Sequence, residues 1–71
     1  GYDAMLVAQE GRCKLCRRPP SLRRLSVDHC HATGAVRGLL CNICNMLMGF
    51  VDADRAFTSR LEAYANARPN L

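Results

Sequence analysis

Two pairs of cysteines form the clearest chemical pattern in this 71-residue sequence. Cys13 and Cys16 make one Cys-x-x-Cys pair, and Cys41 and Cys44 make a second. A two-residue gap lets both thiolates of a pair reach one metal ion, and two pairs complete a closed tetrahedral zinc site. Four thiolates leave no open coordination position, so we expect a structural zinc whose binding energy is part of the folding energy.

Two other interpretations of these cysteines stay open. A redox dithiol is disfavoured because nothing in the sequence supplies the βαβ frame of such motifs. A site of two cysteines with His29 and His31 is the other, but it leaves Cys41 and Cys44 without a function.

A second group of side chains, Asp28, His29, His31 and Asn45, has the composition of a phosphodiester hydrolysis site. Histidine has an ordinary pKa near ~6.5 and can act as a base toward water at neutral pH. Carboxylate and amide oxygens suit Mg²⁺ or Mn²⁺ rather than zinc. Taken singly, each residue also has a structural explanation, such as a turn cap for Asp28 or helix surface for Asn45.

The fifth cysteine, Cys30, lies between the two histidines. Alternation along a strand places it on the opposite face from them. We therefore expect Cys30 to pack rather than to act as a ligand or nucleophile.

Basic residues are concentrated around the cysteines and histidines. Residues 11–40 contain seven basic side chains and a single acid, for a formal charge of +6, whereas the remainder carries −2. The seven are Arg12, Lys14, Arg17, Arg18, Arg23, Arg24 and Arg37. Six arginines favour bidentate phosphate contacts, which predicts a polyanion as partner. The alternative is a solvated basic surface.

Local patterns predict elements that hold these groups. A first helix over residues 3–10 has Asp3 as N-cap and is ended by Gly11. Residues 25–29 and 35–40 alternate like strands around a Thr33-Gly34 turn, which predicts a hairpin.

Two helices are predicted to follow the hairpin. The first covers residues 41–49 and is ended by Gly49, and the second begins after Asp52 as N-cap and is closed by Pro69. Asn45 directly follows Cys44, so a zinc that binds the cysteines also positions the Asn45 side chain. The expected architecture is a small zinc-stabilised α+β domain.

The ordered motif resembles the recombination endonuclease VII family of HNH-type, ββα-metal (His-Me finger) nucleases from phages and bacteria. It runs Cys13-x2-Cys16, then Val27-Asp28-His29-Cys30-His31-x-Thr33-Gly34-x-Val36-Arg37-Gly38-Leu39-Leu40-Cys41-x2-Cys44-Asn45, and the similarity extends from about Tyr2 to Tyr64.

The resemblance implies a role for each matching position. Asp28 and Asn45 hold a catalytic Mg²⁺ or Mn²⁺ ion, His29 is the general base, and His31 orients the water or the scissile phosphate. The paired cysteines hold zinc. The arginines expected to contact the DNA backbone are Arg37, Arg23, Arg24, Arg17 and Arg18.

The sequence departs from the family in two respects. Cys30 stands where many relatives carry an acid. The chain also ends at Leu71 without the C-terminal helices that build the dimer of phage junction-resolving enzymes. We therefore expect nicking or cutting of DNA rather than junction resolution, and the choice between monomer and homodimer stays open.

The sequence analysis predicts one nuclease domain over residues 1–71, either complete or a fragment of a longer protein, since Gly1 is not an initiator. It lacks a secretory signal pattern and a ~20-residue apolar run, so we expect an intracellular protein of a bacterial or phage-infected cytoplasm. The main rival function is a non-catalytic zinc-stabilised module that binds nucleic acid. A weaker rival is a structural domain that docks a protein through the apolar residues Leu47, Met48, Phe50 and Val51, which are more often core.

Overall fold

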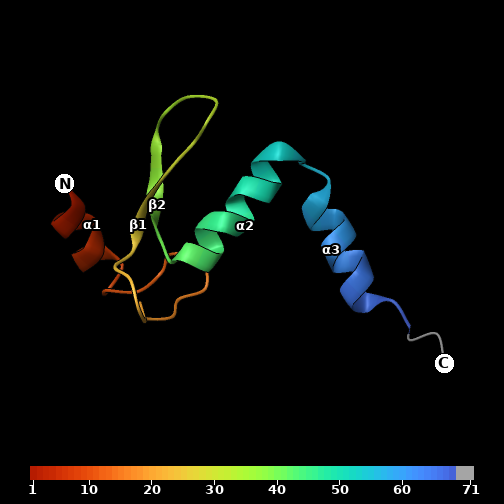
Figure 1. Ribbon diagram of the computed structural model, residues 1–71, viewed down its shortest axis with the longest axis horizontal. Helices are drawn as coiled ribbons and strands as arrows, with labels where there is room; N and C mark the ends of the chain where they lie inside the picture. The colour runs from red at the N-terminus through yellow and green to blue at the C-terminus, as the bar shows by residue number, and fades with distance from the viewer. Residues whose placement is uncertain (69–71) are drawn as a thin grey trace.

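An antiparallel hairpin lies between the first and second helices of the computed structural model, which describes residues 1–68 (Figure 1). Strand β1 spans Ser26–His29 and strand β2 spans Val36–Leu40. Each strand is one residue shorter than predicted, and the pairing itself is confirmed. Gly34 closes the bend with φ of +76°, a left-handed conformation that glycine adopts without a steric cost.

The hairpin contains a β-bulge at Arg37. Asp28 pairs with Gly38 and His29 pairs with Val36, so Arg37 is an extra residue without a partner on β1. In a regular ladder Arg37 would point away from Asp28, because neighbouring residues alternate between faces. A bulge redirects the side chain of the extra residue, and Arg37 contacts the Asp28 carboxylate.

Helix α1 spans Tyr2–Ala8 and precedes the hairpin. The prediction of Asp3 as N-cap is wrong, because Gly1 holds that position and Asp3 lies in the first turn, where its charge favours the helix dipole. The helix ends at Ala8, two residues before the predicted end, and Glu10 and Gly11 just beyond it both adopt positive φ. This confirms Gly11 as part of the stop signal.

The side chain of Gln9 attaches the end of α1 to strand β2. Its amide nitrogen donates to the Leu39 carbonyl at 2.9 Å, and its amide oxygen accepts from the Leu39 N–H at 2.9 Å. Strand β2 therefore has hydrogen bonds on both edges, with β1 on one side and Gln9 on the other.

Helix α2 spans Asn42–Ala53 and runs through Gly49, so the predicted end at Gly49 is wrong. A glycine inside a helix costs only about 1 kcal/mol relative to alanine, and contacts made farther along the helix offset such a cost. The continuation matters for the site, because it places Asp52 in the last turn of α2.

Helix α3 spans Phe57–Asn66, and Asp52 is not its N-cap, contrary to the prediction. Ala56 holds the N-cap position, and the Asp54 carboxylate accepts a hydrogen bond from the Ala56 N–H at 3.1 Å. Asp54 also pairs with Arg60. The predicted closure at Pro69 lies outside the described residues.

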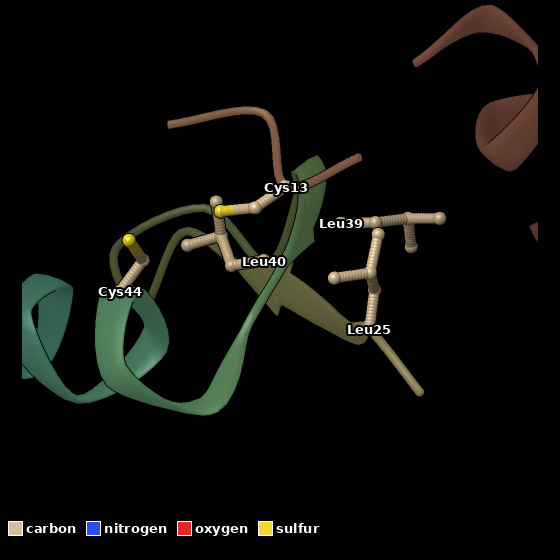
Figure 2. Packing of buried hydrophobic residues seen from close by; sticks show 5 residues of the cluster. All are labelled: Cys13, Leu25, Leu39, Leu40 and Cys44. Atoms are coloured by element: carbon tan, nitrogen blue, oxygen red, sulfur yellow. The ribbon is translucent and has the colours of Figure 1, made fainter. Parts of the chain in front are cut away.

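The buried core is small and includes two of the paired cysteines (Figure 2). It consists of Cys13, Leu25, Leu39, Leu40 and Cys44. A fully buried leucine contributes about 1.5–3 kcal/mol, so three leucines cannot alone order a chain of this length. The composition of the core therefore indicates that the cysteines contribute more than their apolar area.

Helix α3 extends away from the hairpin and contacts α2 near its own start, where the Phe50 and Phe57 ring centroids are 5.8 Å apart (Figure 1). None of its residues is buried. Within residues 1–68, no helix has the length and apolar character needed to cross a membrane. Met48 packs on the core, whereas Leu47 and Phe50 are exposed, so the apolar stretch of α2 is only partly core.

Candidate functional site

The four paired cysteines meet at one point between the turn of residues 13–16, the end of β2 and the start of α2. Their Sγ atoms all lie within 4.8 Å of one another, and the Cys16 and Cys41 sulfurs are 3.9 Å apart. Zinc–sulfur bonds of ~2.3 Å in a tetrahedron give sulfur–sulfur distances of roughly 3.8 Å. The cluster therefore has nearly the dimensions that a zinc ion requires.

The two Cys-x-x-Cys pairs have the same local geometry. In each pair the backbone N–H of the second cysteine donates to the sulfur of the first, at 3.5 Å for Cys16 to Cys13 and 3.4 Å for Cys44 to Cys41. Such donors stabilise a thiolate. Cys41 also serves as the N-cap of α2, so the same residue starts the helix and contributes a sulfur to the cluster.

The electrostatics of the cluster also fit a bound cation. Burial raises the pKa of the Cys13 thiol, but backbone donors, including those of Cys41 and Cys16, outweigh it and lower the value to about 6. Burial and the neighbouring sulfurs raise the pKa of Cys44 to about 12. A negative charge is thus favoured at Cys13 and opposed at Cys44, so a bound cation would stabilise the charged form of Cys44.

The alternative site of two cysteines and two histidines is not what the protein forms. Within the described part of the chain, the four cysteines are the only group of three or more metal-binding side chains that converge. His29 and His31 are exposed and do not belong to it. The four cysteines could bind zinc, as predicted from their spacing.

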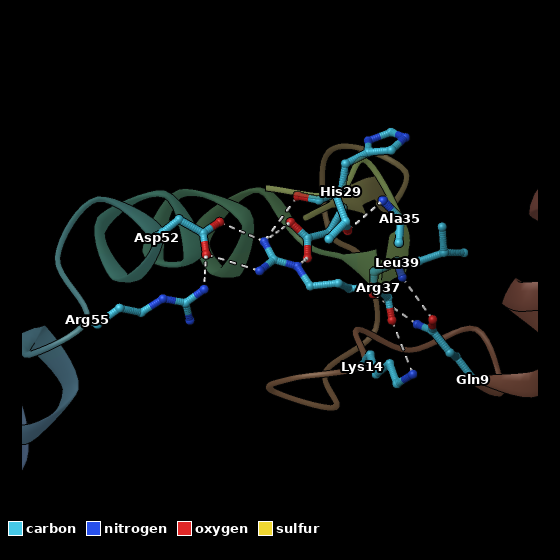
Figure 3. A network of polar contacts seen from close by, with 10 residues as sticks. Gln9, Lys14, His29, Ala35, Arg37, Leu39, Asp52 and Arg55 are labelled. Atoms are coloured by element: carbon cyan, nitrogen blue, oxygen red, sulfur yellow. Dashed lines mark hydrogen bonds and ion pairs between the residues drawn. The ribbon is translucent and has the colours of Figure 1, made fainter. Parts of the chain in front are cut away.

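Arg37 joins the hairpin to α2 through two bidentate ion pairs (Figure 3). Its Nε donates to Asp28 Oδ2 at 2.7 Å and its Nη2 donates to Asp28 Oδ1 at 3.1 Å. Its other edge faces Asp52, with Nη1 at 3.1 Å from Oδ1 and Nη2 at 2.8 Å from Oδ2. Nη2 also donates to the His29 carbonyl at 3.2 Å. One guanidinium therefore binds two carboxylates from different elements.

The partners of Arg37 are largely shielded from solvent. The side chains of Asp28 and Asp52 are 8% and 11% exposed, and that of Arg37 is 27% exposed. The hydrogen bond from Arg37 lowers the pKa of Asp52, and Asp52 and Asp28 in turn raise the pKa of Arg37. Because the Asp52 pKa is lowered on folding, its contribution to stability is present at neutral pH and is lost as the pH falls through the acid range.

Of the four predicted catalytic side chains, only that of Asp28 takes part in the Arg37 network. Asp28 is buried and faces α2 through Arg37, whereas the His29 imidazole is exposed and points away from the Arg37–Asp52 pairing (Figure 3). Asn45 is exposed on α2, and His31 is exposed in the hairpin bend. Cys30 is half-buried beyond β1 and lies outside the leucine–cysteine core.

Four of the five arginines predicted to contact DNA are exposed, namely Arg17, Arg18, Arg23 and Arg24. Arg18 and Arg23 line a hollow of about 220 Å³ beside the cysteine cluster and the first turn of α2. Arg24 lies over the Tyr2 ring at 4.2 Å, which couples α1 to the basic loop, the arginine-bearing segment of residues 17–24. The fifth, Arg37, directs its guanidinium to carboxylates instead.

Asp52 is a polar residue of this site that sequence reasoning did not find. The available signal is its spacing, because Asp52 follows Asn45 by seven residues, or two helical turns. This spacing was not used because Gly49 predicted an end of the helix between Asn45 and Asp52.

Comparison with known proteins relates the chain to phage proteins. Gene 59 protein of Mycobacterium phage D29 is 58% identical over 45 residues, which cover 62% of this chain and 27% of that protein. Gene 59 protein of Mycobacterium phage L5 is 60% identical over 38 residues, covering 52% of this chain and 23% of that protein. The matches thus span about a quarter of the length of these relatives.

The family comparison covers nearly all of the described structure. The profile for recombination endonuclease VII matches residues 1–67, which include the cysteine cluster, the hairpin and all three helices. On this match, the chain belongs to the recombination endonuclease VII family.

Proposed function

We propose that the chain is a metal-dependent DNA endonuclease domain of the HNH, His-Me finger type. The observation that carries this proposal is the placement of two side chains in a member of this family: Asp28 lies on β1, which Arg37 joins to α2, and Asn45 lies on α2 directly after Cys44 of the cluster. The relatives are phage proteins, so we place its action in the phage-infected bacterial cell.

Asp28 and Asn45 have the donor chemistry for Mg²⁺ or Mn²⁺. Each Asp28 oxygen accepts one hydrogen bond from Arg37, which leaves a further lone pair on each oxygen for a cation. The Asn45 side chain, exposed on α2, offers an amide oxygen. A divalent ion held there would neutralise charge on the scissile phosphate and the departing 3′ oxygen.

In this mechanism His29 accepts a proton from the water that attacks phosphorus, and His31 helps to orient the water or the phosphate. Attack in line requires the base and the leaving oxygen on opposite sides of phosphorus. The His29 imidazole is exposed and points away from the Arg37–Asp52 pairing, which leaves it open to a water molecule (Figure 3). Cleavage then produces 5′-phosphate and 3′-hydroxyl ends.

A second candidate function is a non-catalytic module that binds nucleic acid. The observation that favours it is the Arg37 guanidinium on the Asp28 carboxylate, since that ion pair could serve structure alone. Both candidates use the same exposed arginines, so affinity for DNA does not separate them and turnover does.

Incubation of the zinc-loaded protein with supercoiled plasmid separates the two functions. We expect nicked or linear DNA only when Mg²⁺ or Mn²⁺ is added. Asn45→Ala should reduce the rate by about 100-fold or more, because removal of a metal ligand takes away several kcal/mol of charge stabilisation. Asn66→Ala is the matched control, since Asn66 is also an exposed helical asparagine but lies on α3. Plasmid that is bound but stays uncut with either metal would establish the binding module instead.

The basic loop beside the cysteine cluster should supply the phosphate contacts. The double variant Arg18→Ala/Arg23→Ala should weaken DNA binding and flatten its salt dependence, by about 0.9 in the slope of log K against log salt for each phosphate that is no longer neutralised. Arg60→Ala/Arg68→Ala removes equal charge near α3 and should leave the slope close to the wild-type value. Equal slopes for the two double variants, measured by fluorescence anisotropy, would rule out this loop as the contact surface.

A further inference from the structure

Helix α2 is attached to the rest of the molecule at both ends. Cys41 and Cys44 join its first turn to the cysteine cluster, and Asp52 joins its last turn to Arg37 of the hairpin. A helix held only at its first turn can pivot about that point. The Asp52–Arg37 ion pair removes this freedom, because it is bidentate and 2.8 Å at its shorter contact.

Asn45 lies between these two attachments on the same side of the helix as Asp52. Seven residues correspond to two turns and a rise of about 10.5 Å, so Asn45 and Asp52 share a face. Asn45 therefore lies in a helical segment whose two ends are both held. Its position relative to Asp28 therefore depends on the Asp52 contact as well as on the cysteines.

Arg37 links Asp52 directly to the orientation of Asp28. The guanidinium is planar and rigid, and it meets each carboxylate edge-on through two hydrogen bonds. A rotation of Arg37 would rotate the plane of the Asp28 carboxylate with it. Asp52 restrains that rotation from the opposite edge.

Charge points to the same role for Asp52. Arg37 alone would place a full positive charge on the Asp28 carboxylate and oppose the approach of a cation. The Asp52 carboxylate also pairs with the Arg37 guanidinium and offsets its positive charge. Asp28, Arg37 and Asp52 together therefore carry one net negative charge. Arg55 is farther away, at 3.6 Å from Asp52, and its side chain is 72% exposed, so solvent screens its contribution.

We propose that Asp52 is a positioning residue for Asp28 and Asn45, the two proposed ligands of the divalent ion. Through Arg37 it sets the orientation of the Asp28 carboxylate and its separation from Asn45. This inference rests on the proposed endonuclease function. Asp52 itself contacts neither metal nor DNA in this scheme.

The test is a titration of the zinc-loaded protein with Mn²⁺. The electron paramagnetic resonance signal of free Mn²⁺ measures how much of the ion is bound. Asp52→Asn keeps the size of the side chain and removes its charge, and we expect Mn²⁺ affinity to fall by roughly 10–100-fold, the usual effect of losing a residue that orients a metal ligand. Asp54→Asn is the matched control, because Asp54 lies two residues away and pairs with Arg60 rather than Arg37. Its Mn²⁺ affinity should equal that of the wild type.

If Asp52→Asn fails to bind zinc or to form its helices, the variants Asp52→Glu and Asp52→Gln provide a second comparison. These two variants match in size and differ in charge, so Asp52→Glu should bind Mn²⁺ more tightly than Asp52→Gln if the ion pair with Arg37 is what matters. A purely structural role would lower the stability of Asp52→Asn and leave its Mn²⁺ affinity unchanged, which would overturn the inference.

The Asp28→Ala variant separates this result from a failure of the proposed function. Mn²⁺ that binds to the wild type but not to Asp28→Ala establishes the metal site on which the inference depends. Wild-type affinity in Asp52→Asn would then refute the role of Asp52 alone. Equal Mn²⁺ binding by the wild type and Asp28→Ala would refute both the metal site and the inference.

Discussion

Replacing His29 with alanine will lower the rate of Mg²⁺-dependent plasmid cleavage by roughly 10²–10⁴-fold, the usual contribution of a general base. Histidine is the side chain whose ordinary pKa lies nearest to neutrality. The other histidine of this bend, His31, orients the water or the phosphate in this mechanism and does not accept the proton. The imidazole is exposed, and its removal leaves the core and the cysteine cluster untouched. The loss should therefore appear in cleavage with little change in zinc content or DNA affinity.

Added imidazole provides a direct check on the role of His29. If the side chain accepts a proton, free imidazole in the buffer should restore part of the activity of His29→Ala and none of that of Asn45→Ala. His31→Ala is the comparison within the same bend, and its loss should be smaller because His31 does not accept the proton. A His29→Ala protein that nicks plasmid at the wild-type rate would disprove the mechanism.

Removal of zinc from the cysteine cluster will unfold the domain. A structural zinc site contributes about 10–16 kcal/mol at neutral pH, whereas whole domains are stable by only about 5–15 kcal/mol. Here the remaining core consists of three leucines, and two of the five buried residues are themselves cysteines of the cluster. When a chelator removes the zinc, the circular dichroism signal at 222 nm should decrease as all three helices are lost.

Single substitutions distinguish the cluster from the fifth cysteine. Cys44→Ser should abolish stoichiometric zinc binding and ordered structure, because Cys44 is buried and its sulfur completes the cluster. Cys30→Ser should keep both, because Cys30 lies outside the cluster. Omitting Mg²⁺ should stop cleavage without changing the spectrum. A spectrum that stays the same after zinc is stripped would contradict the four-cysteine assignment.

Features that depend on neighbouring residues were predictable from the sequence. The two-residue gap in each cysteine pair determines which atoms can reach a common metal, and both pairs do converge in the structure. Alternating residues around Thr33-Gly34 likewise predicted the hairpin, because strand pairing across a short bend needs only local information. The signals for Gly11 and for the start of α2 were local in the same way.

Errors arose where a weak local preference met a contact from elsewhere in the chain. Gly49 and Asp52 looked like the end of one helix and the start of the next, and each preference is worth about 1 kcal/mol. In the structure, Asp52 instead forms a shielded ion pair with Arg37, a residue fifteen positions earlier. That contact exists only once α2 lies against the hairpin, and no pattern within the helix reports it.

The sequence by itself determined the residue types at the candidate site and the cysteine spacing that gathers four sulfurs. Only the tertiary structure decided where Arg37 points. Strand alternation assigns it to the face opposite Asp28, and a basic side chain beside the cysteines suggested a DNA contact. The bulge in β2 turns Arg37 toward Asp28, and the extended α2 presents Asp52 to its other edge. Both depend on pairing register and helix packing, which arise from contacts between distant segments rather than from neighbouring residues.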